Sequence, residues 1–174
     1  MKEMINQWEY AEQIHKAVSK GVLLTAKADG EVNAMTSSWG TMGTQWAKPI
    51  FICFVRQSRY TKTLLDKNPE FTVNIPLHEN VKEILRVCGT QSGRDVDKVK
   101  TLGLTLEDGE TVAVPGIRQL PLTLECKVIY KQDQDLSALC PESRTHYYKP
   151  GTSDEADFHT AYYGEITAAY ILKD

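Results

Sequence analysis

The chain has 174 residues, of which 41% are apolar and 11 are glycine, the composition of an ordinary globular domain. A chain of this length buries roughly 70% of the surface that its unfolded form exposes, so a single domain over residues 1–174 needs no disulfide or structural metal. Twenty basic and 23 acidic residues give a net charge of −3 without a long basic block, which argues against nucleic acid as a partner.

Apolar stretches are short throughout the sequence. The longest covers residues 50–55, far below the ~20 residues that span a bilayer. The N-terminal segment is charged and has no apolar stretch before a small-residue cleavage site, so no secretion signal is predicted. We therefore expect a cytoplasmic protein without a membrane partner.

The four cysteines stand far apart and form no Cys-x-x-Cys pair, which argues against zinc or iron–sulfur ligation, and no metal site is expected. Cys53, Cys88 and Cys126 lie in apolar segments and are expected to be reduced core residues. Cys140 precedes Pro141 in a polar stretch and is expected at the surface.

The first predicted element is a helix over residues 6–20. Asn6 and Glu9 resemble an N-cap pair, and apolar residues then recur at helical spacing. Lys20 and Gly21 supply the usual signals for a helix end.

Strands with inserted helices follow in the rest of the chain. Asp29-Gly30 is a hairpin-turn dipeptide, so residues 22–27 and 32–39 are predicted to pair. Residues 77–88 carry apolar positions at helical spacing and predict an amphipathic helix. The other predicted elements are strands at 49–55, 71–75, 104–107, 112–114, 120–131 and 162–172, a helix at 61–67, a short helix or ordered loop at 92–100, and a surface loop at 132–157.

This succession predicts a mainly β fold with inserted helices. Six or more strands with few β-α-β alternations favour a closed antiparallel barrel over a doubly wound sheet. We expect residues 21–174 to form this barrel behind the N-terminal helix.

Residues 56–62, with the sequence Arg-Gln-Ser-Arg-Tyr-Thr-Lys, lie between an apolar strand and a helix start. Two arginines, two hydroxyl side chains and the unpaired N–H groups of a helix N-terminus suit a phosphate or another dianion. An ordinary capped helix with solvated arginines fits the same residues, and no Walker-type phosphate loop occurs. From the residues alone both interpretations stay open.

A second candidate segment covers residues 33–40, a strand whose end carries small hydroxyl side chains and then Trp39. Small residues let a flat ligand approach the backbone, whose N–H and C=O groups can read its polar edge. The alternative is an edge strand with solvent-facing Thr and Ser. No Gly-x-Gly-x-x-Gly occurs, so a nicotinamide cofactor is not held by a Rossmann unit.

His159 marks the third candidate, where the polar loop meets the last strand. It is either a contact to a substrate or cofactor, or a surface histidine beside an aromatic core strand. No Ser or Cys nucleophile has a recognisable base nearby in the sequence, so covalent hydrolysis is not supported.

Together these segments resemble the flavin reductase-like family, the FMN-binding split barrels that include flavoredoxin. The order and approximate spacing hold from about residue 20 to the C-terminus. The matching pieces are residues 33–39, 49–61, 71–76 and 88–98, then Leu124-Glu125-Cys126, then His159 five residues before Gly164.

The resemblance implies an antiparallel split β-barrel that assembles as a homodimer and binds FMN. It places the FMN phosphate on Arg56, Ser58, Arg59, Tyr60 and Thr61, the flavin ring along Met35, Thr36, Ser37, Ser38 and Trp39, and Ser92, Gly93 and Lys98 at the border of this region. His159 matches a histidine on the nicotinamide side, although here Phe158 separates it from Asp157, whereas many relatives have Asp-His adjacent. The long polar segment 132–157 is expected to cover the flavin.

The implied activity is that of an oxidoreductase, with hydride transfer from NADH or NADPH to flavin N5 and passage of electrons to a small-molecule or protein acceptor. Two alternatives stay open. One is a flavoredoxin-like electron carrier that a protein partner reduces, and the other is a flavin-binding or storage module without turnover.

Overall fold

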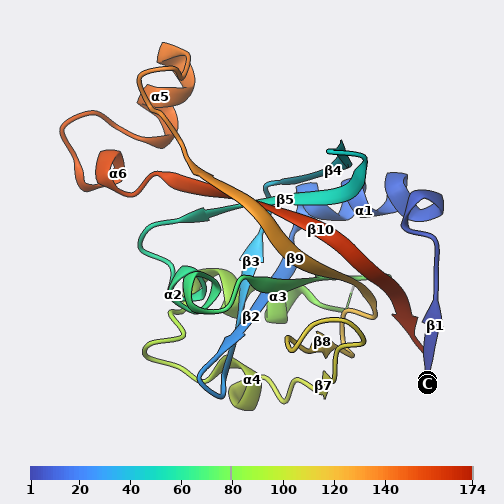
Figure 1. Cartoon of the computed structure of the whole chain (residues 1–174). Helices are drawn as coiled ribbons and strands as arrows, with labels where there is room; N and C mark the ends of the chain where they lie inside the picture. The colour runs from blue at the N-terminus through green and yellow to red at the C-terminus, as the bar shows by residue number, and fades with distance from the viewer. Residues whose placement is uncertain (79, 174) are drawn as a thin grey trace.

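The computed structural model describes residues 1–78 and 80–173 (Figure 1). Ten strands account for most of the secondary structure. They are β1 (Lys2–Met4), β2 (Val22–Ala28), β3 (Glu31–Ser37), β4 (Gly40–Gln45), β5 (Lys48–Arg56), β6 (Glu70–Ile75), β7 (Leu106–Glu107), β8 (Gly116–Ile117), β9 (Leu122–Asp133) and β10 (His159–Leu172).

Helices connect these strands. A 3-10 turn, η1 (Gln7–Tyr10), leads into α1 (Ala11–Lys20), and the others are α2 (Tyr60–Lys67), α3 (Lys82–Thr90), α4 (Lys98–Thr101), α5 (Pro141–Tyr147) and α6 (Ser153–Ala156). No helix among the described residues has the length and apolar character needed to cross a membrane.

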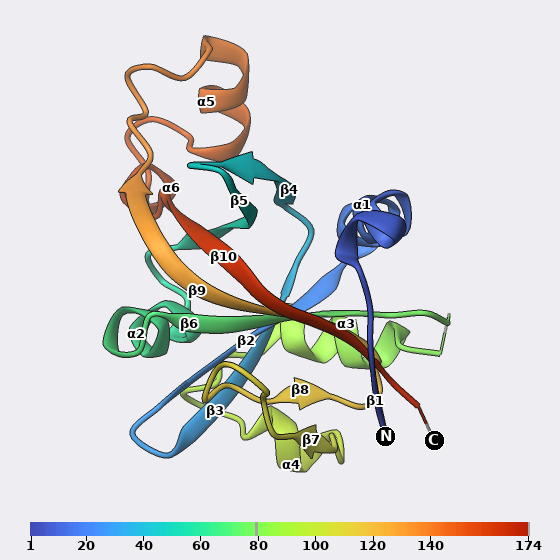
Figure 2. The same cartoon turned by 45° about the vertical axis from the view of Figure 1, so that its right-hand side comes forward.

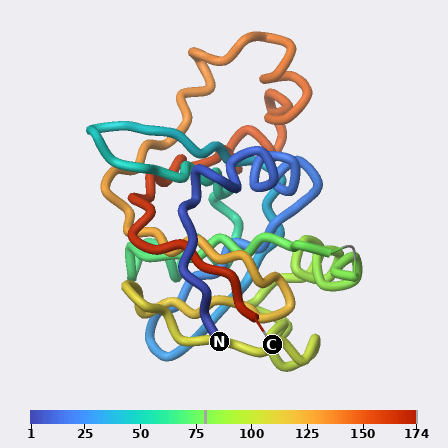
Figure 3. The backbone as a smooth tube through the Cα atoms, turned by 90° about the vertical axis from the view of Figure 1, so that its right-hand side faces the viewer, coloured from blue at the N-terminus to red at the C-terminus, as the bar shows by residue number. Residues whose placement is uncertain are grey.

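One antiparallel sheet organises the chain, in the order β3-β2-β6-β9-β10-β5-β4 with β1 paired to β10. The long strands β9 and β10 form its twisted centre (Figure 2). Their pairing shifts register between Tyr163 and Gly164 and again between Ile166 and Ala168, and such bulges increase strand twist. Figure 3 shows the two termini side by side, where Lys173 N–H donates to Met1 O.

The main core is formed by strands of the sheet together with α1 and α2, and it explains why the N-terminal helix forms. Ile14 and Val18, four residues apart, are the two buried side chains of α1. The helix ends at Gly21, whose φ of 120° favours glycine and whose N–H donates to the Ala17 and Val18 carbonyls. Asn6 accepts from Trp8 N–H, so the predicted cap exists, although it caps the 3-10 turn η1 and the α-helix begins only at Ala11.

The predicted cysteine environments are confirmed. Cys53, Cys88 and Cys126 are buried, and Cys140 is exposed. Burial raises the pKa of the Cys88 thiol, so it is protonated at neutral pH.

The strand predicted at residues 112–114 is wrong. The buried carboxylate of Glu125 accepts hydrogen bonds from the backbone N–H groups of Glu110 and Thr111, and also from the Thr111 hydroxyl. The Ala113 backbone N–H likewise donates to the Glu70 carboxylate at 2.8 Å, so side chains bind backbone groups that a strand would pair, and Val112 and Val114 are buried without a ladder.

Other boundaries also differ from the sequence predictions. The helix predicted at 77–88 begins only at Lys82 and continues through Gly89, which lies against Thr36. The loop predicted at 132–157 contains α5 and α6, and β4 was not predicted. The hairpin between β4 and β5 turns at Trp46 and Ala47, both at positive φ, so no glycine marks the turn.

Candidate functional site

Two small cavities share the lining residues Met35 and Arg59. The β3 cavity, of about 180 Å³, is lined by Met35, Thr36, Ser37, Ser38, Trp39, Phe54, Arg56, Arg59 and His159. The α2 cavity, of about 130 Å³, is lined by Asn33, Met35, Ser58, Arg59, Tyr60, Thr61, Cys88, Thr90, Gln91, Ser92, Gly93 and Lys98. Every site residue predicted from the sequence lines one of them, so the fold brings the three candidate segments together.

The start of α2 is fixed to β3 by a buried contact. Asn33 Nδ2 donates to Thr61 Oγ1 at 2.8 Å. The loop before α4 then packs onto the same place, because a Cβ atom on Gly93 would lie 2.2 Å from Asn33 Oδ1 and 2.7 Å from the Tyr60 ring. Only glycine permits this approach, which carries Ser92 and Lys98 to the helix start.

Lys98 is a buried cation beside the α2 cavity. The residue is 3% exposed, and among the described residues its Nζ reaches only the Gln91 carbonyl, at 3.3 Å. No carboxylate pairs with it among the described residues. Burial lowers the pKa of Lys98, and the charge of Arg59 acts in the same direction. An unpaired buried ammonium is costly, so this cavity favours an anion.

The helix start adds hydrogen-bond donors to the same cavity. In the described part of the chain no acceptor is found for the backbone N–H groups of Tyr60 and Thr61, and no side chain caps α2. Helix N-terminal N–H groups with a positive dipole end bind anions. The α2 cavity therefore has the chemistry of a phosphate site.

Arg56 and Ser58 already have partners in the segment that follows β9. Asp157 accepts from the Ser58 backbone N–H at 2.7 Å and from its hydroxyl at 2.9 Å. Arg56 donates to the Asp157 carbonyl at 3.1 Å and to the Tyr147 carbonyl at 3.2 Å. These two residues anchor segment 134–158 to the start of α2, and Arg56 lines the β3 cavity rather than the α2 cavity.

The hydroxyl groups on β3 are also engaged within the protein. Thr36 Oγ1 donates to the Leu85 carbonyl at 2.6 Å, and Ser37 Oγ donates to the Trp39 carbonyl at 2.9 Å. However, β3 is the last strand at its end of the sheet, so one edge of its backbone is unpaired within the described residues. A flat ligand in the β3 cavity would meet backbone N–H and C=O groups rather than these hydroxyls.

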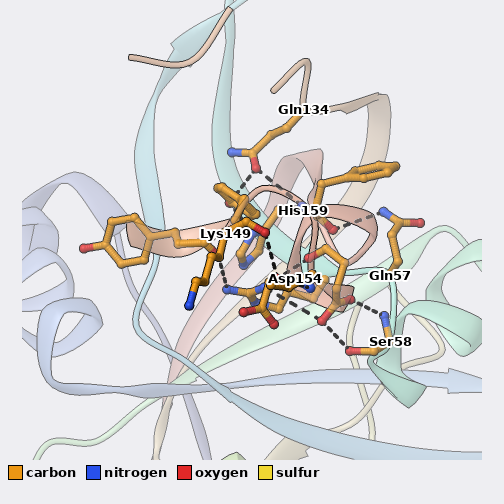
Figure 4. Close-up of polar contacts among 12 residues, drawn as sticks. Gln57, Ser58, Gln134, Lys149, Asp154 and His159 are labelled. Atoms are coloured by element: carbon orange, nitrogen blue, oxygen red, sulfur yellow. Dashed lines mark hydrogen bonds and ion pairs between the residues drawn. The ribbon is translucent and has the colours of Figure 1, made fainter. Parts of the chain in front are cut away.

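His159 is buried, at 6% exposure, so the interpretation as a surface histidine is wrong. Its ring packs against Trp39 with centroids 4.8 Å apart, and Tyr147 meets Trp39 edge-on at 5.0 Å. Figure 4 shows Gln134 on one side of His159, and Gln57 and Ser58 on the other. Burial and the nearby charge of Arg56 lower the pKa of His159 to about 4, so the ring is neutral at pH 7.

The low pKa of His159 makes stability depend on pH. The unfolded chain protonates this ring near pH 6.5 and the folded chain near pH 4, so between these values the unfolded state holds more protons. The contribution of His159 to stability is complete above pH 6.5 and is lost as pH falls toward 4. We expect the urea midpoint to fall more steeply over this window in the wild type than in His159→Gln, and equal slopes would contradict a buried neutral ring.

Comparison with known proteins assigns the chain to a family. The family model "Flavin reductase like domain" matches residues 15–174. The chain belongs to the flavin reductase-like family. An uncharacterised protein of Archaeoglobus fulgidus is 29% identical over 127 residues, which cover 73% of this chain and 67% of that protein.

Solved structures of flavin reductase-like proteins share the fold. The flavoredoxin of Methanosarcina acetivorans has a TM-score of 0.67 at 26% identity, over 88% of this chain and 68% of that one. The flavoredoxin of Desulfovibrio vulgaris also has a TM-score of 0.67, at 23% identity, over 88% of this chain and 69% of that one. The predicted fold class, an antiparallel split barrel with inserted helices, and the resemblance to this FMN-binding family are thus confirmed.

Three residues of this flavin reductase-like protein were missed by sequence reasoning. Gln134 and Tyr148 contact His159, and Asp157 contacts Ser58, yet all three lie in or beside a polar stretch without periodicity. The only available signal was the position of Asp157, two residues before His159.

Proposed function

We propose that this protein binds FMN across the two cavities and works as an oxidoreductase through it. The observation that carries the proposal is Lys98, a buried ammonium without a carboxylate partner among the described residues, beside a helix start with free N–H groups. A phosphate supplies the missing negative charge. The residues present therefore fit the phosphate end of FMN.

The phosphate would lie in the α2 cavity and the ring in the β3 cavity. Neither cavity alone reaches the roughly 300 Å³ at the lower end of ligand pockets, whereas a ligand that passes Met35 and Arg59 occupies both. The phosphate set is Arg59, Tyr60, Thr61, Ser92, Gly93 and Lys98, with Ser58 at its border. Arg56 and the residues from Met35 to Trp39 face the ring.

The protein's own groups have three tasks in this arrangement. FMN, when bound, supplies hydride and electron transfer at its ring. The unpaired edge of β3 orients the ring through backbone N–H and C=O groups, and Trp39, packed edge-on against Tyr147, forms part of the cavity wall. His159 stays neutral and offers a ring nitrogen beside the cavity.

The electron donor distinguishes two forms of this function. A flavin reductase accepts hydride from NADH or NADPH and passes electrons to a small molecule or a protein. A flavoredoxin-like carrier receives electrons from a protein, and the likeness to the flavoredoxin of Methanosarcina acetivorans supports this second form. A flavin-storage module would hold FMN without turnover.

Two measurements test the proposal. FMN is expected to bind more tightly than riboflavin, which lacks the phosphate, and equal dissociation constants would contradict the placement at Lys98. Anaerobic mixing of the FMN-loaded protein with NADH or NADPH then separates the forms. Rapid bleaching of the flavin absorbance indicates a reductase, and bleaching only with a reduced protein donor indicates a carrier. A flavin that no donor reduces would contradict an oxidoreductase.

We also propose that the protein is a cytoplasmic homodimer. Trp46 at the tip of the β4–β5 hairpin is 53% exposed and lies beside Tyr130, which is 42% exposed, and Tyr163. Exposed clusters of aromatic side chains often mark protein contacts. Sedimentation velocity is expected to give twice the 19.6 kDa chain mass, and a monomer at micromolar concentration would contradict the dimer.

A further inference from the structure

His159 is held by two side chains from segment 134–158. Its Nδ1 lies 2.5 Å from the hydroxyl oxygen of Tyr148, and that oxygen lies 2.7 Å from Gln134 Oε1. The backbone N–H of His159 also points at Gln134 Oε1, at 3.4 Å. Tyr148 and His159 are buried and Gln134 is half-buried, so water cannot freely exchange for these partners.

The number of protons on these groups selects one arrangement of the hydrogen bonds among Gln134, Tyr148 and His159. Burial raises the pKa of Tyr148, and burial beside Arg56 lowers the pKa of His159, so at pH 7 the hydroxyl has one proton and the imidazole one N–H. Gln134 Oε1 receives the His159 backbone N–H and is the acceptor end of its amide. Tyr148 therefore donates to Gln134, and the Nδ1–H of His159 donates to Tyr148.

The reverse arrangement leaves an unfavourable pair. If Tyr148 donated to Nδ1, its oxygen would face Gln134 Oε1 with no proton between them. If the Gln134 amide were rotated, its NH₂ group would face the backbone N–H of His159. Unmade hydrogen bonds in a buried site are costly, and the local low dielectric increases that cost.

We propose that Tyr148 and Gln134 are positioning residues that hold His159 in its Nδ1-protonated tautomer, so that Nε2 is a proton-free acceptor for a ligand in the β3 cavity. Nε2 has no hydrogen-bond partner among the described residues, and His159 lines that cavity. Two cations, Arg56 and Arg59, disfavour a second proton on this ring, and Asp157 alone favours it.

This tautomer determines which ligand groups the site accepts. An unprotonated Nε2 binds a group with its own N–H or O–H, such as an amide or a hydroxyl, and repels a bare carboxylate. When this preference is applied to the electron donor or acceptor, it rests on the proposed function. The assignment of the tautomer does not rest on the proposed function.

The test is nitrogen NMR of the full-length, flavin-free protein with ¹⁵N in its histidine rings. Protonated and bare ring nitrogens of a neutral imidazole give well-separated signals, and His159→Gln identifies the signals of His159 among the four histidines. In the wild type at pH 7 we expect a protonated Nδ1 and a bare Nε2.

Two substitutions at Gln134 separate positioning from packing. In Gln134→Leu the acceptor is lost, so the Tyr148 hydroxyl turns to Nδ1 and the proton moves to Nε2, changing the tautomer ratio by about tenfold. Gln134→Glu still accepts from Tyr148 and is expected to keep the Nδ1–H tautomer. Tyr148→Phe removes the hydroxyl and is expected to lose the preference as well.

A wild-type ring protonated on Nε2, or the same tautomer ratio in Gln134→Leu and Gln134→Glu, would overturn the inference. Because the spectra are recorded without flavin, they do not depend on FMN binding. A protein that shows the Nδ1–H tautomer but binds no FMN would contradict the proposed function while supporting this inference.

Discussion

Replacing Lys98 by methionine is expected to weaken FMN binding by about 10- to 150-fold, the equivalent of one hydrogen bond to a charged group. The side chain is buried beside the α2 cavity, and in the described part of the chain its Nζ contacts only the Gln91 carbonyl. The charge of Lys98 is therefore available to a bound phosphate. Methionine fills a similar space without the charge. Riboflavin, which has no phosphate, is expected to bind the variant and the wild type alike.

The same substitution is expected to stabilise the protein when no flavin is present. An unpaired buried ammonium opposes folding, and an apolar side chain of similar length removes that cost. If Lys98→Met raises the free energy of unfolding but lowers FMN affinity, Lys98 serves ligand binding rather than the stability of the fold.

Lys100→Met is the matched control. Lys100 lies on the same helix, α4, with its side chain exposed and away from the lining of the α2 cavity. The Lys100→Met variant is expected to bind FMN with an affinity within about twofold of the wild type. Titration of flavin fluorescence at fixed ionic strength measures all three proteins, and equal losses in Lys98→Met and Lys100→Met would indicate only a general effect of net charge.

The sequence groups residues that the fold does bring together, whereas it misplaces the bounds of several elements around them. Residues from β3, the start of α2 and the loop before α4 were grouped through a resemblance, and the fold places all of them at two adjoining cavities. From the local pattern alone, the segment around Arg59 was compatible with a phosphate site and with an ordinary helix cap. What favours the anion is the burial of Lys98, and no local pattern reveals that.

The polar segment after β9 shows the limit of sequence reasoning. It was predicted as a surface loop because it is polar and contains proline and glycine, yet Tyr148 is buried and Asp157 binds Ser58 and Arg56. Likewise, where a strand was predicted at 112–114, the Ala113 backbone N–H donates to the Glu70 carboxylate instead of to a neighbouring strand. In both places a side chain distant in sequence satisfies the backbone or a site residue, which only the tertiary structure specifies.

Gly164→Ala is expected to destabilise the protein by about 1–3 kcal/mol, the cost of overpacking a core. The position appeared in the sequence only as a glycine five residues after His159, and the structure gives the reason for it. A Cβ atom there would lie 2.5 Å from the Phe71 ring and 2.8 Å from the Cys126 Cβ, and both of those side chains are fully buried. Neither can move aside without displacing β6 or β9.

Gly43→Ala supplies the comparison, since Gly43 also lies in a strand but a Cβ there meets nothing within 4 Å. This change is expected to be neutral or slightly stabilising, because alanine restricts the unfolded chain. For a protein of this length, thermal melting should show a Tm lowered by about 2–12 °C in Gly164→Ala and nearly unchanged in Gly43→Ala. Because Gly164 lies on the same strand as His159, a loss of stability without a loss of FMN affinity would show that this glycine serves the core that supports the site, whereas an unchanged Tm would contradict the tight packing of Phe71 against β10.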